Sequence, residues 1–371
     1  MRHLASIQRI TDIRPIEGKD RIVQCHVNGW NVIIQKDQFE DGDKAVYVEI
    51  DSVLPEKPEF EFLRPKKFRI KTMKMANVLS EGICFPLSIL PAREKPYEIG
   101  EDVTEIMGVA KYEPPEDDWW KNLTPAEAKK KPWLQTLPLM KYRWYRRLFG
   151  SKKIERGFPD LFPKSDEVRV QNIPDILMDK NIKWLASEKV DGCSASYLLQ
   201  RRKRFLLPDT FDFVVCSRNL RLGKDDSHYW KVAEKYEIEK TLRAIIGDQD
   251  WVAIQGEIIG PKIQNNKYKR QNYELYVFNL LWPNKNPVLK QTWQRSSSIA
   301  AKELLEPYGM NFVPILDTYV TLPDTVDETL AIAHGQSKLG DTLREGIVFR
   351  SMDGVQSFKA VDPEFLIHYK I

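Results

Sequence analysis

The sequence predicts an α+β protein of two domains: a small β-barrel or sandwich, then a larger domain that mixes strands and helices. Its length of 371 residues exceeds what one simple core usually takes. Hydrophobic residues at 42% and charged residues at 30% are the balance of a soluble globular protein, which excludes the disordered and fibrous classes. Short strand-like runs fill the first hundred residues, whereas strands and helices alternate after residue 184.

The first predicted domain covers residues 1–106. Its β-branched and aromatic runs include RIVQCHV, WNVIIQ and AVYVEI, each long enough for one short strand. Turn signals separate the runs at Asn28-Gly29 and at residues 41–43. Strands this short at this spacing are typical of a small barrel or sandwich.

Residues 107–183 form a predicted connector, because the prolines at positions 114, 115, 125, 132, 138, 159 and 163 interrupt any long element there. Residues 141–147 read KYRWYRR and interleave cations with aromatic rings. That pattern suits stacking on RNA bases, but it could equally be an amphipathic helix packed between domains or an insertion peculiar to this protein. A membrane-surface helix is a weaker option.

The second predicted domain covers residues 184–371. Strand-like runs there are KWLASEKV, FDFVVCSR, WVAIQGEII, ELYVFNLL and EGIVFRS. They alternate with two helical stretches, HYWKVAEKYEIEKTLRAII and SSSIAAKELLEPYG. The alternation predicts a mixed α+β domain of about 185 residues.

Several classes of protein are excluded or disfavoured by what the sequence lacks. There is no apolar run of the ~18 residues that a membrane span requires, and the first residues lack the apolar stretch of a secretory signal. We therefore expect an intracellular protein of unknown compartment that does not bind membranes. The four cysteines show no CxxC spacing, which disfavours a structural zinc site. The net charge of +4 is too small to indicate a polyanion partner, so such a partner must be recognised from local clusters.

A possible nucleophile lies where the first strand of the second domain ends, in the sequence EKVDG at residues 188–192. A strand period of two predicts Lys189 and Asp191 on one face and Val190 on the other. Gly192 allows another chain or a ligand to approach the backbone. A lysine can be a covalent nucleophile when its amine is uncharged, which burial or a nearby metal cation promotes. Taken alone, however, the string more often marks an ordinary surface ion pair.

Two further acids accompany this lysine at strand ends. Glu257 lies between small residues in GEIIG, and Glu345 begins EGIVFR, where we expect Ile347 and Phe349 to share its face. Hard oxygen ligands suit Mg²⁺ or Mn²⁺, so Asp191, Glu257 and Glu345 could hold a hydrated metal near a triphosphate. For each acid alone, a solvated strand end is the more common explanation.

Aromatic and basic residues on neighbouring runs complete the pattern. Tyr276 and Phe278 alternate along YVFN and so share a face, where either ring could stack on a purine or simply fill the core. Arg218 follows one strand and Lys359 ends another, each placing a cation where a phosphate could be bound.

Six short sequences in order, EKVDG, SRN, GEIIG, YVFN, EGIVF and SFKAV, resemble the motifs of the covalent nucleotidyltransferase superfamily of ATP-dependent ligases and capping enzymes. The resemblance covers nearly all of residues 184–361. It implies an ATP-grasp-like nucleotidyltransferase domain of antiparallel sheets and helices. It also implies that Lys189 attacks the α-phosphate of ATP, releases pyrophosphate and forms lysyl-AMP. AMP would then pass to a 5′-phosphate end, and a 3′-hydroxyl would displace it.

The same resemblance implies roles around the nucleotide, residue by residue. They are Lys189 as the adenylated lysine, Glu188 near the adenine edge, Asp191 and Glu257 at the ribose or a metal-bound water, Gly192 in the nucleotide-binding turn, Arg218 at the ribose or a phosphate, Phe278 on the adenine face, Glu345 in the water shell of the metal, and Lys359 at the α-phosphate. Many relatives carry a KxK pair in the last motif, whereas the positions around Lys359 are Ser357 and Val361. Step-one chemistry would then depend more on the metal or on another basic residue.

The order of the domains selects among branches of the superfamily. Only 12 residues follow Lys359, too few for the trailing OB domain of DNA ligases and capping enzymes. The first hundred residues instead resemble the OB module that precedes the catalytic domain in one clade of RNA ligases, as does FPKSDEVRVQN further on. The resemblance therefore implies an ATP-dependent RNA ligase, a monomer that repairs nicks in RNA duplexes bearing 3′-hydroxyl and 5′-phosphate ends.

An OB barrel presents a groove for nucleic acid, and a basic run around a predicted strand would supply phosphate contacts or merely a solvated face. Its cations are Arg64, Lys66, Lys67, Arg69, Lys71 and Lys74. Three alternatives stay open: a capping-type guanylyltransferase that uses GTP, a DNA ligase, and a non-catalytic RNA-binding protein. The last would not need Lys189, Glu257 and Glu345 together.

Overall fold

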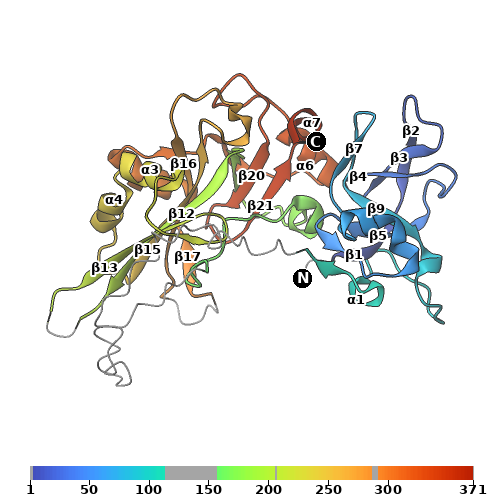
Figure 1. Cartoon of the computed structure of the whole chain (residues 1–371), viewed down its shortest axis with the longest axis horizontal. Helices are drawn as coiled ribbons and strands as arrows, with labels where there is room; N and C mark the ends of the chain where they lie inside the picture. The colour runs from blue at the N-terminus through green and yellow to red at the C-terminus, as the bar shows by residue number, and fades with distance from the viewer. Residues whose placement is uncertain (1–2, 113–156, 205–206, 286–290, 371) are drawn as a thin grey trace, which may run out of the picture.

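The computed structural model describes residues 3–112, 157–204, 207–285 and 291–370. The chain forms two sheet-rich domains that lie side by side (Figure 1). The N-terminal domain, in blue, lies on the right of that view, and the C-terminal domain, in green to red, lies on the left. The α+β organisation predicted from the sequence is confirmed.

The N-terminal domain consists of short antiparallel strands. The sheets follow the orders β1-β5-β9 and β2-β3-β4, with the pairs β6-β10 and β7-β8 beside them. The elements are β1 (Ala5–Arg9), β2 (Thr11–Pro15), β3 (Ile22–Val27), β4 (Trp30–Gln35), β5 (Lys44–Glu49), β6 (Ser52–Val53), β7 (Met73–Met75), β8 (Val78–Ser80), β9 (Gly82–Pro86), α1 (Thr104–Met107) and β10 (Ala110–Lys111).

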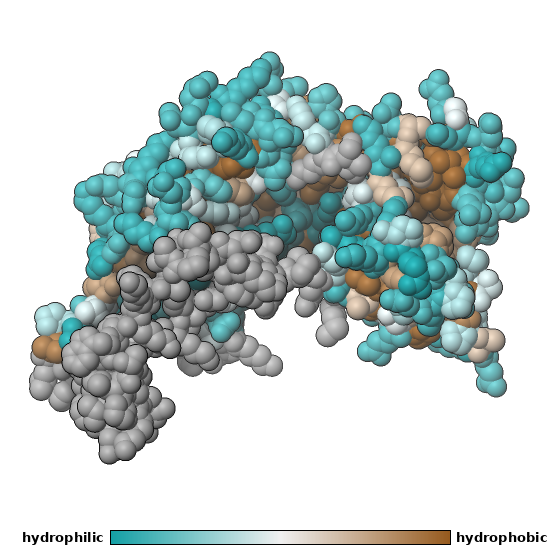
Figure 2. Space-filling view, in the orientation of Figure 1, coloured by the Kyte–Doolittle hydropathy of each residue, from teal (hydrophilic) through white to brown (hydrophobic). Residues whose placement is uncertain are grey.

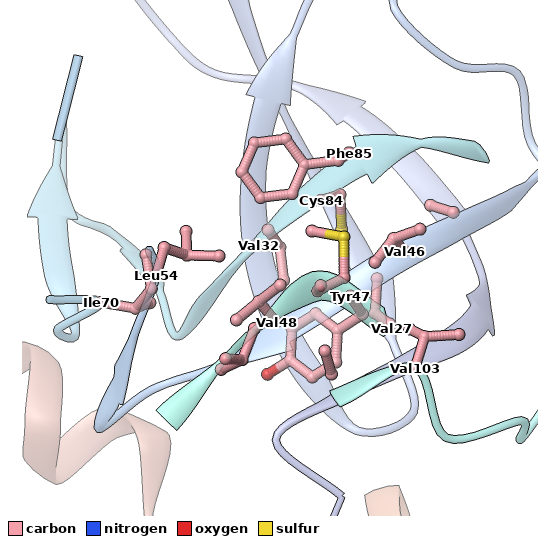
Figure 3. Close-up of a cluster of buried hydrophobic side chains, with 14 of the residues drawn as sticks. Val27, Val32, Val46, Tyr47, Val48, Leu54, Ile70, Cys84, Phe85 and Val103 are labelled. Carbon is pink, nitrogen blue, oxygen red and sulfur yellow. The ribbon is translucent and has the colours of Figure 1, made fainter. Parts of the chain in front are cut away.

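The predicted turn at Asn28-Gly29 joins β3 to β4. Asn28 has φ 48° and Gly29 has φ 77°, so both central residues are left-handed, as a type I′ hairpin requires. Val27 therefore pairs with Trp30. Figure 3 shows the core that this arrangement encloses. Strands β3, β4, β5 and β9 contribute buried side chains to it, among them Val27, Val32, Val46, Tyr47, Val48, Cys84 and Phe85.

The C-terminal domain contains two sheets, antiparallel in every pairing except that of β18 with β16, which is parallel. One has the order β19-β11-β20-β21, and the other has the order β14-β13-β12-β15-β16-β17 with β18 paired to β16. The strands are β11 (Trp184–Glu188), β12 (Cys193–Arg202), β13 (Thr210–Cys216), β14 (Arg221–Leu222), β15 (Trp251–Ile259), β16 (Glu274–Pro283), β17 (Trp293–Arg295), β18 (Asn311–Phe312), β19 (Ile315–Val320), β20 (Gly346–Ser351) and β21 (Ser357–Val361).

Helices cover these sheets. They are α3 (His228–Lys235), α4 (Ile238–Ile245), α5 (Ser298–Leu305), α6 (Val326–Ala333) and α7 (Pro363–Phe365), the last continued by a π-helical turn (Leu366–Lys370). The first predicted helical stretch is two helices, because Glu237 between them has φ 45°. The sequence pattern did not predict α6, which begins with a capping box formed by Thr325 and Glu328.

The two domains contact each other directly. Arg169 Nη1 donates to Glu81 Oε1 at 2.8 Å, and Asn172 Nδ2 donates to Glu49 Oε2 at 2.8 Å. Lys74 Nζ, on the β7–β8 hairpin, donates to the Ile367 carbonyl at 2.8 Å. The surface is hollowed between the domains, and hydrophilic residues line much of the visible hollow (Figure 2).

Candidate active site

A cavity of about 450 Å³ brings together every residue that the sequence predicts for nucleotide binding. The two sheets of the C-terminal domain supply most of its wall, because the turn from β11 to β12 crosses from one sheet to the other. The predicted residues in the wall are Glu188, Lys189, Asp191, Gly192, Arg218, Glu257, Phe278, Glu345 and Lys359. Charged side chains thus dominate the site.

The candidate nucleophile lies in this turn. Strand β11 ends at Glu188, so a strand period does not apply to Lys189 and Asp191, although both residues line the cavity. Lys189 Nζ instead contacts Glu345 Oε2 at 2.6 Å, while the Asp191 carboxylate forms an ion pair with Lys267. Strand periodicity fails because the chain leaves one sheet and enters the other within four residues. The Lys189 amide also donates to the Gly346 carbonyl at 2.9 Å, which ties the turn to β20.

Glu257 lies on β15 opposite Ser194 and supports the same turn. Its carboxylate accepts hydrogen bonds from the Gly192 amide at 3.2 Å and from Ser194 Oγ at 3.0 Å. A Cβ at Gly192 would lie 2.2 Å from the Ile258 carbonyl oxygen, so a glycine is required there. Burial raises the pKa of Glu257 to about 7, with Lys189 and Ser194 opposing and the neighbouring acids adding to the rise.

Glu345 precedes β20, which begins at Gly346 with φ 152°. The expectation that Ile347 and Phe349 share its face is wrong. Those two side chains pack in the core with Trp184, whereas Val348 and Arg350 line the cavity with Glu345. The left-handed backbone at Gly346 shifts the alternation by one residue. A Cβ there would lie 2.2 Å from the Ala360 carbonyl oxygen.

Lys359 lies on β21 opposite Val348 and faces the same cavity. Burial, and then the nearby positive charges of Lys189 and Arg169, lower its pKa to about 8. Val361, one of the two positions flanking Lys359 where a second lysine could complete a KxK pair, is buried with Leu79 and Phe365. Arg169 lies beside Lys359, pairs with it as an isolated parallel bridge and also lines the cavity.

The remaining predicted residues occupy defined positions. Both Glu188 oxygens accept hydrogen bonds, from Ser337 Oγ and from the Lys338 amide at 2.8 Å, and burial raises the pKa of this carboxyl. The Arg218 guanidinium binds both oxygens of Asp166, at 2.5 and 3.2 Å. Phe278 lies in the cavity wall and clusters with Tyr276, so the shared face predicted for the pair is confirmed.

Several charged residues that line or adjoin the cavity were not predicted from the sequence. Arg350 is fully buried, pairs with Glu167 at 3.1 Å, and lies 5.6 Å from the centroid of the Phe278 ring. Arg169 and Glu167 occur in FPKSDEVRVQN, whose alternation of acids and cations was the signal available. Lys267 gave no signal, because its partner Asp191 is 76 residues away.

Divalent metal binding is compatible with the donor set. Glu257 and Glu345 lie near the Asp191 carboxylate, and their mutual repulsion adds to the raised pKa of Glu257, which a cation would relieve. Within the described residues, no three His, Cys, Asp or Glu side chains gather closely enough to ligate a metal directly. The arrangement therefore fits a hydrated ion held through water, the form that Mg²⁺ prefers.

The basic run of the N-terminal domain differs from its prediction. Arg64 and Lys66 belong to a 3₁₀ helix (Pro58–Lys66), not to a strand, since Pro58 and Pro65 favour that conformation over pairing. Arg64 pairs with Glu61, and Arg69 pairs with Asp51 while lying over the Tyr112 ring. The exposed cations of this run are Arg64, Lys66, Lys67 and Lys71. Residues 141–147 lie outside the described part of the chain.

Comparisons with known proteins agree with this geometry. A family model for an OB-fold domain matches residues 4–87, and one for RNA ligase matches residues 182–361. An apo mutant of Naegleria gruberi RNA ligase is 30% identical, with a TM-score of 0.69 over 100% of this chain and 98% of that one. The chain belongs to the RNA ligase family. It is an enzyme of the ligase class, with an N-terminal OB fold ahead of its nucleotidyltransferase domain, as predicted.

Two further structures of mutants of the Naegleria ligase are similar to this RNA ligase family member. One was solved with ATP and Mn, at 30% identity and a TM-score of 0.69, and covers 100% of both chains. Another, with AMP and Mn, has the same identity and TM-score and covers 100% of this chain and 99% of that one. A search of curated protein sequences finds no match. Over the described residues, no helix is long and apolar enough to cross a membrane.

Proposed function

We propose that this RNA ligase family member uses ATP to form lysyl-AMP on Lys189, transfers AMP to a 5′-phosphate end and joins that end to a 3′-hydroxyl. The observation that carries the proposal is the position of Lys189 in the cavity. Its Nζ lies 2.6 Å from Glu345 Oε2, and Glu257 and Lys359 line the same space. Binding RNA alone would not need this set, which disfavours the non-catalytic alternative.

The first step follows from these positions. The amine lone pair of Lys189 attacks the α-phosphorus of ATP, and the bond to the pyrophosphate oxygen breaks. The amine must be neutral to attack, and the Glu345 carboxylate is placed to hold the proton that it loses. The product is a phosphoramidate between Nζ and AMP, with pyrophosphate released.

Cations around the cavity stabilise the negative charge that moves onto pyrophosphate. Lys359 enters the cavity from β21 beside Arg169, and the Arg218 guanidinium lies in the wall at the end of β13. Fixed cations that face the developing charge lower the barrier without reorganising. In our proposal Phe278 stacks on the adenine and Glu188 orients its edge.

A divalent ion, Mg²⁺ or Mn²⁺, would be held through water by Asp191, Glu257 and Glu345. When bound, such an ion supplies positive charge that neutralises phosphate oxygens. The Naegleria ligase structures with ATP and Mn and with AMP and Mn support this choice of cofactors.

The strand to be sealed is proposed to be RNA at a nick in a duplex, bound by a monomer of the enzyme. The exposed Lys66, Lys67 and Lys71 would contribute phosphate contacts from the OB fold. A DNA ligase and a capping-type guanylyltransferase remain the alternatives, because both use the same lysine chemistry.

A sealing assay tests the proposal. Purified protein is incubated with ATP, Mg²⁺ or Mn²⁺, and a labelled duplex whose nick carries a 3′-hydroxyl and a 5′-phosphate. RNA strands, DNA strands and single-stranded RNA are compared, and GTP replaces ATP in a parallel series. We expect ATP-dependent sealing of nicked RNA and none by Lys189→Ala. Sealing of DNA alone, or reaction with GTP alone, would support the corresponding alternative instead.

A further inference from the structure

The loop between β15 and β16 makes several contacts with the turn that carries Lys189. Lys267 forms an ion pair with the Asp191 carboxylate, and the hydroxyl of Tyr268 accepts a hydrogen bond from the Asp191 amide at 3.0 Å. Gln264 Nε2 donates to the Gly192 carbonyl at 3.3 Å. One loop thus holds both the side chain and the backbone of this turn.

The backbone of this loop is strained. Five of its non-glycine residues have positive φ between 43° and 64°, namely Lys262, Gln264, Asn265, Asn266 and Lys269. Side chains in the left-handed region are strained, and such strain persists where the surroundings fix it and function uses it. Two hydrogen bonds of 2.9 Å between Asn266 and Arg270 brace the loop.

The ion pair is shielded from water. The Lys267 side chain is 8% exposed and that of Asp191 is 4% exposed. The Lys267 ammonium lies 4.3 Å from the centroid of the Phe365 ring and 4.9 Å from that of Tyr369. The C-terminal segment 363–369 therefore covers it. A buried ion pair contributes little net stability, since well-packed apolar residues in its place usually stabilise a fold as much. We therefore expect this pair to matter for the orientation of the Asp191 side chain.

We propose that Lys267 is a positioning residue for lysyl-AMP formation: it fixes the Asp191 carboxylate, and with it the turn that carries Lys189, in the orientation that the cavity requires. This inference rests on the proposed function. Lys267 does not line the cavity, whereas Asp191 does, so Lys267 acts through Asp191 and does not contact the nucleotide.

The test compares Lys267→Met with Lys267→Arg and with Lys269→Met, a matched control that alters an exposed lysine of the same loop. The readout is the single-turnover rate of AMP transfer from labelled ATP to the protein, at saturating and at varied ATP. We expect Lys267→Met to lower the maximal rate at least tenfold with a smaller change in half-saturating ATP. Lys267→Arg should recover most of the rate, and Lys269→Met should match the wild type.

A double-mutant cycle separates positioning from a general structural role. In the Asp191→Asn background, adding Lys267→Met should change the rate by less than twofold, because the partner of Lys267 is already neutral. The thermal unfolding midpoint in EDTA gives a readout without nucleotide or metal. There Lys267→Met should unfold at a lower temperature than the double variant, in which the buried Asp191 charge is removed together with the ammonium that compensates it.

Several results would overturn the proposal. The first is that Lys267→Met forms lysyl-AMP at the wild-type rate. The second is that Lys267→Met lowers the rate by the same factor in the wild-type and Asp191→Asn backgrounds. The third is that the double variant is no more stable than Lys267→Met. Should Lys267→Met fail to fold, the folding of the double variant and the rate of Lys267→Arg decide. If the wild type takes up no AMP, the proposed function fails. If the wild type takes up AMP and Lys267→Met takes it up at the same rate, only this inference fails.

Discussion

Replacing Lys359 with methionine should stabilise the protein while it abolishes adenylylation. The cavity wall lowers the pKa of this lysine from 10.5 to about 8, chiefly by burial. Each pKa unit corresponds to about 1.4 kcal/mol, so keeping the ammonium charged costs up to about 3 kcal/mol at pH 7. Part of the side chain faces cavity water, which reduces this value. We therefore expect Lys359→Met to raise the free energy of unfolding by about 1–3 kcal/mol at pH 7.

The pH dependence gives a second check on the same variant. Between pH 8 and pH 10.5 the unfolded chain holds a proton on Lys359 that the folded chain has lost, so wild-type stability rises over that range. The Lys359→Met curve should lack this rise and meet the wild-type curve near pH 10.5. Urea denaturation followed by tryptophan fluorescence measures both curves.

Activity should move in the opposite direction to stability. The cation is proposed to stabilise charge on the leaving pyrophosphate, and the loss of one such group typically costs about 10²-fold or more in rate. The control is Lys302→Met, an exposed position on α5, which should change stability by less than about 0.5 kcal/mol and leave activity intact. A Lys359→Met protein that is less stable than the wild type would contradict the cost of burying this ammonium, and one that forms the adenylate normally would contradict its proposed role.

Two further predictions concern the carboxylate side of the cavity. Gly192→Ala places a Cβ 2.2 Å from the Ile258 carbonyl and should cost about 1–3 kcal/mol in urea denaturation along with most of the activity, whereas Gly223→Ala, where no atom lies within 4 Å, should be neutral. Glu257 has a folded pKa of about 7, above its usual 4.5, so the stability that it contributes below pH 4.5 should be lost as the pH rises to 7. Glu257→Gln should remove this fall in the free energy of unfolding between pH 4.5 and pH 7. An unchanged fall in the variant would contradict the raised pKa of Glu257.

The residues of the candidate site could be predicted because they occur as ordered motifs at strand ends. All of the predicted nucleotide-site residues reach one cavity, since antiparallel pairing brings β12, β15 and β16 together and β11, β20 and β21 together. The directions of side chains were less predictable. Strand periodicity gave the wrong face for Ile347 because the left-handed Gly346 shifts the alternation. The shared face of Tyr276 and Phe278 was right because both lie within one continuous strand.

Long-range partners could not be predicted from local patterns. Lys267 lies in a loop whose fold depends on strained backbone, and its contact with Asp191 exists only once β15 and β16 and the C-terminal segment have packed. The same holds for Arg169, which reaches the cavity through its bridge to β21. The sequence around these residues shows that the segment is charged, but not the direction in which each side chain points.

The most direct test of the central claim is to locate AMP on the protein. The purified enzyme is incubated with ATP and Mg²⁺ or Mn²⁺, denatured, digested and examined by mass spectrometry, with Lys189→Ala and Lys359→Met alongside. We expect an acid-labile AMP adduct on Lys189 in the wild type, none in Lys189→Ala and very little in Lys359→Met. An adduct on another residue, or none on a folded wild-type protein under either metal, would contradict it.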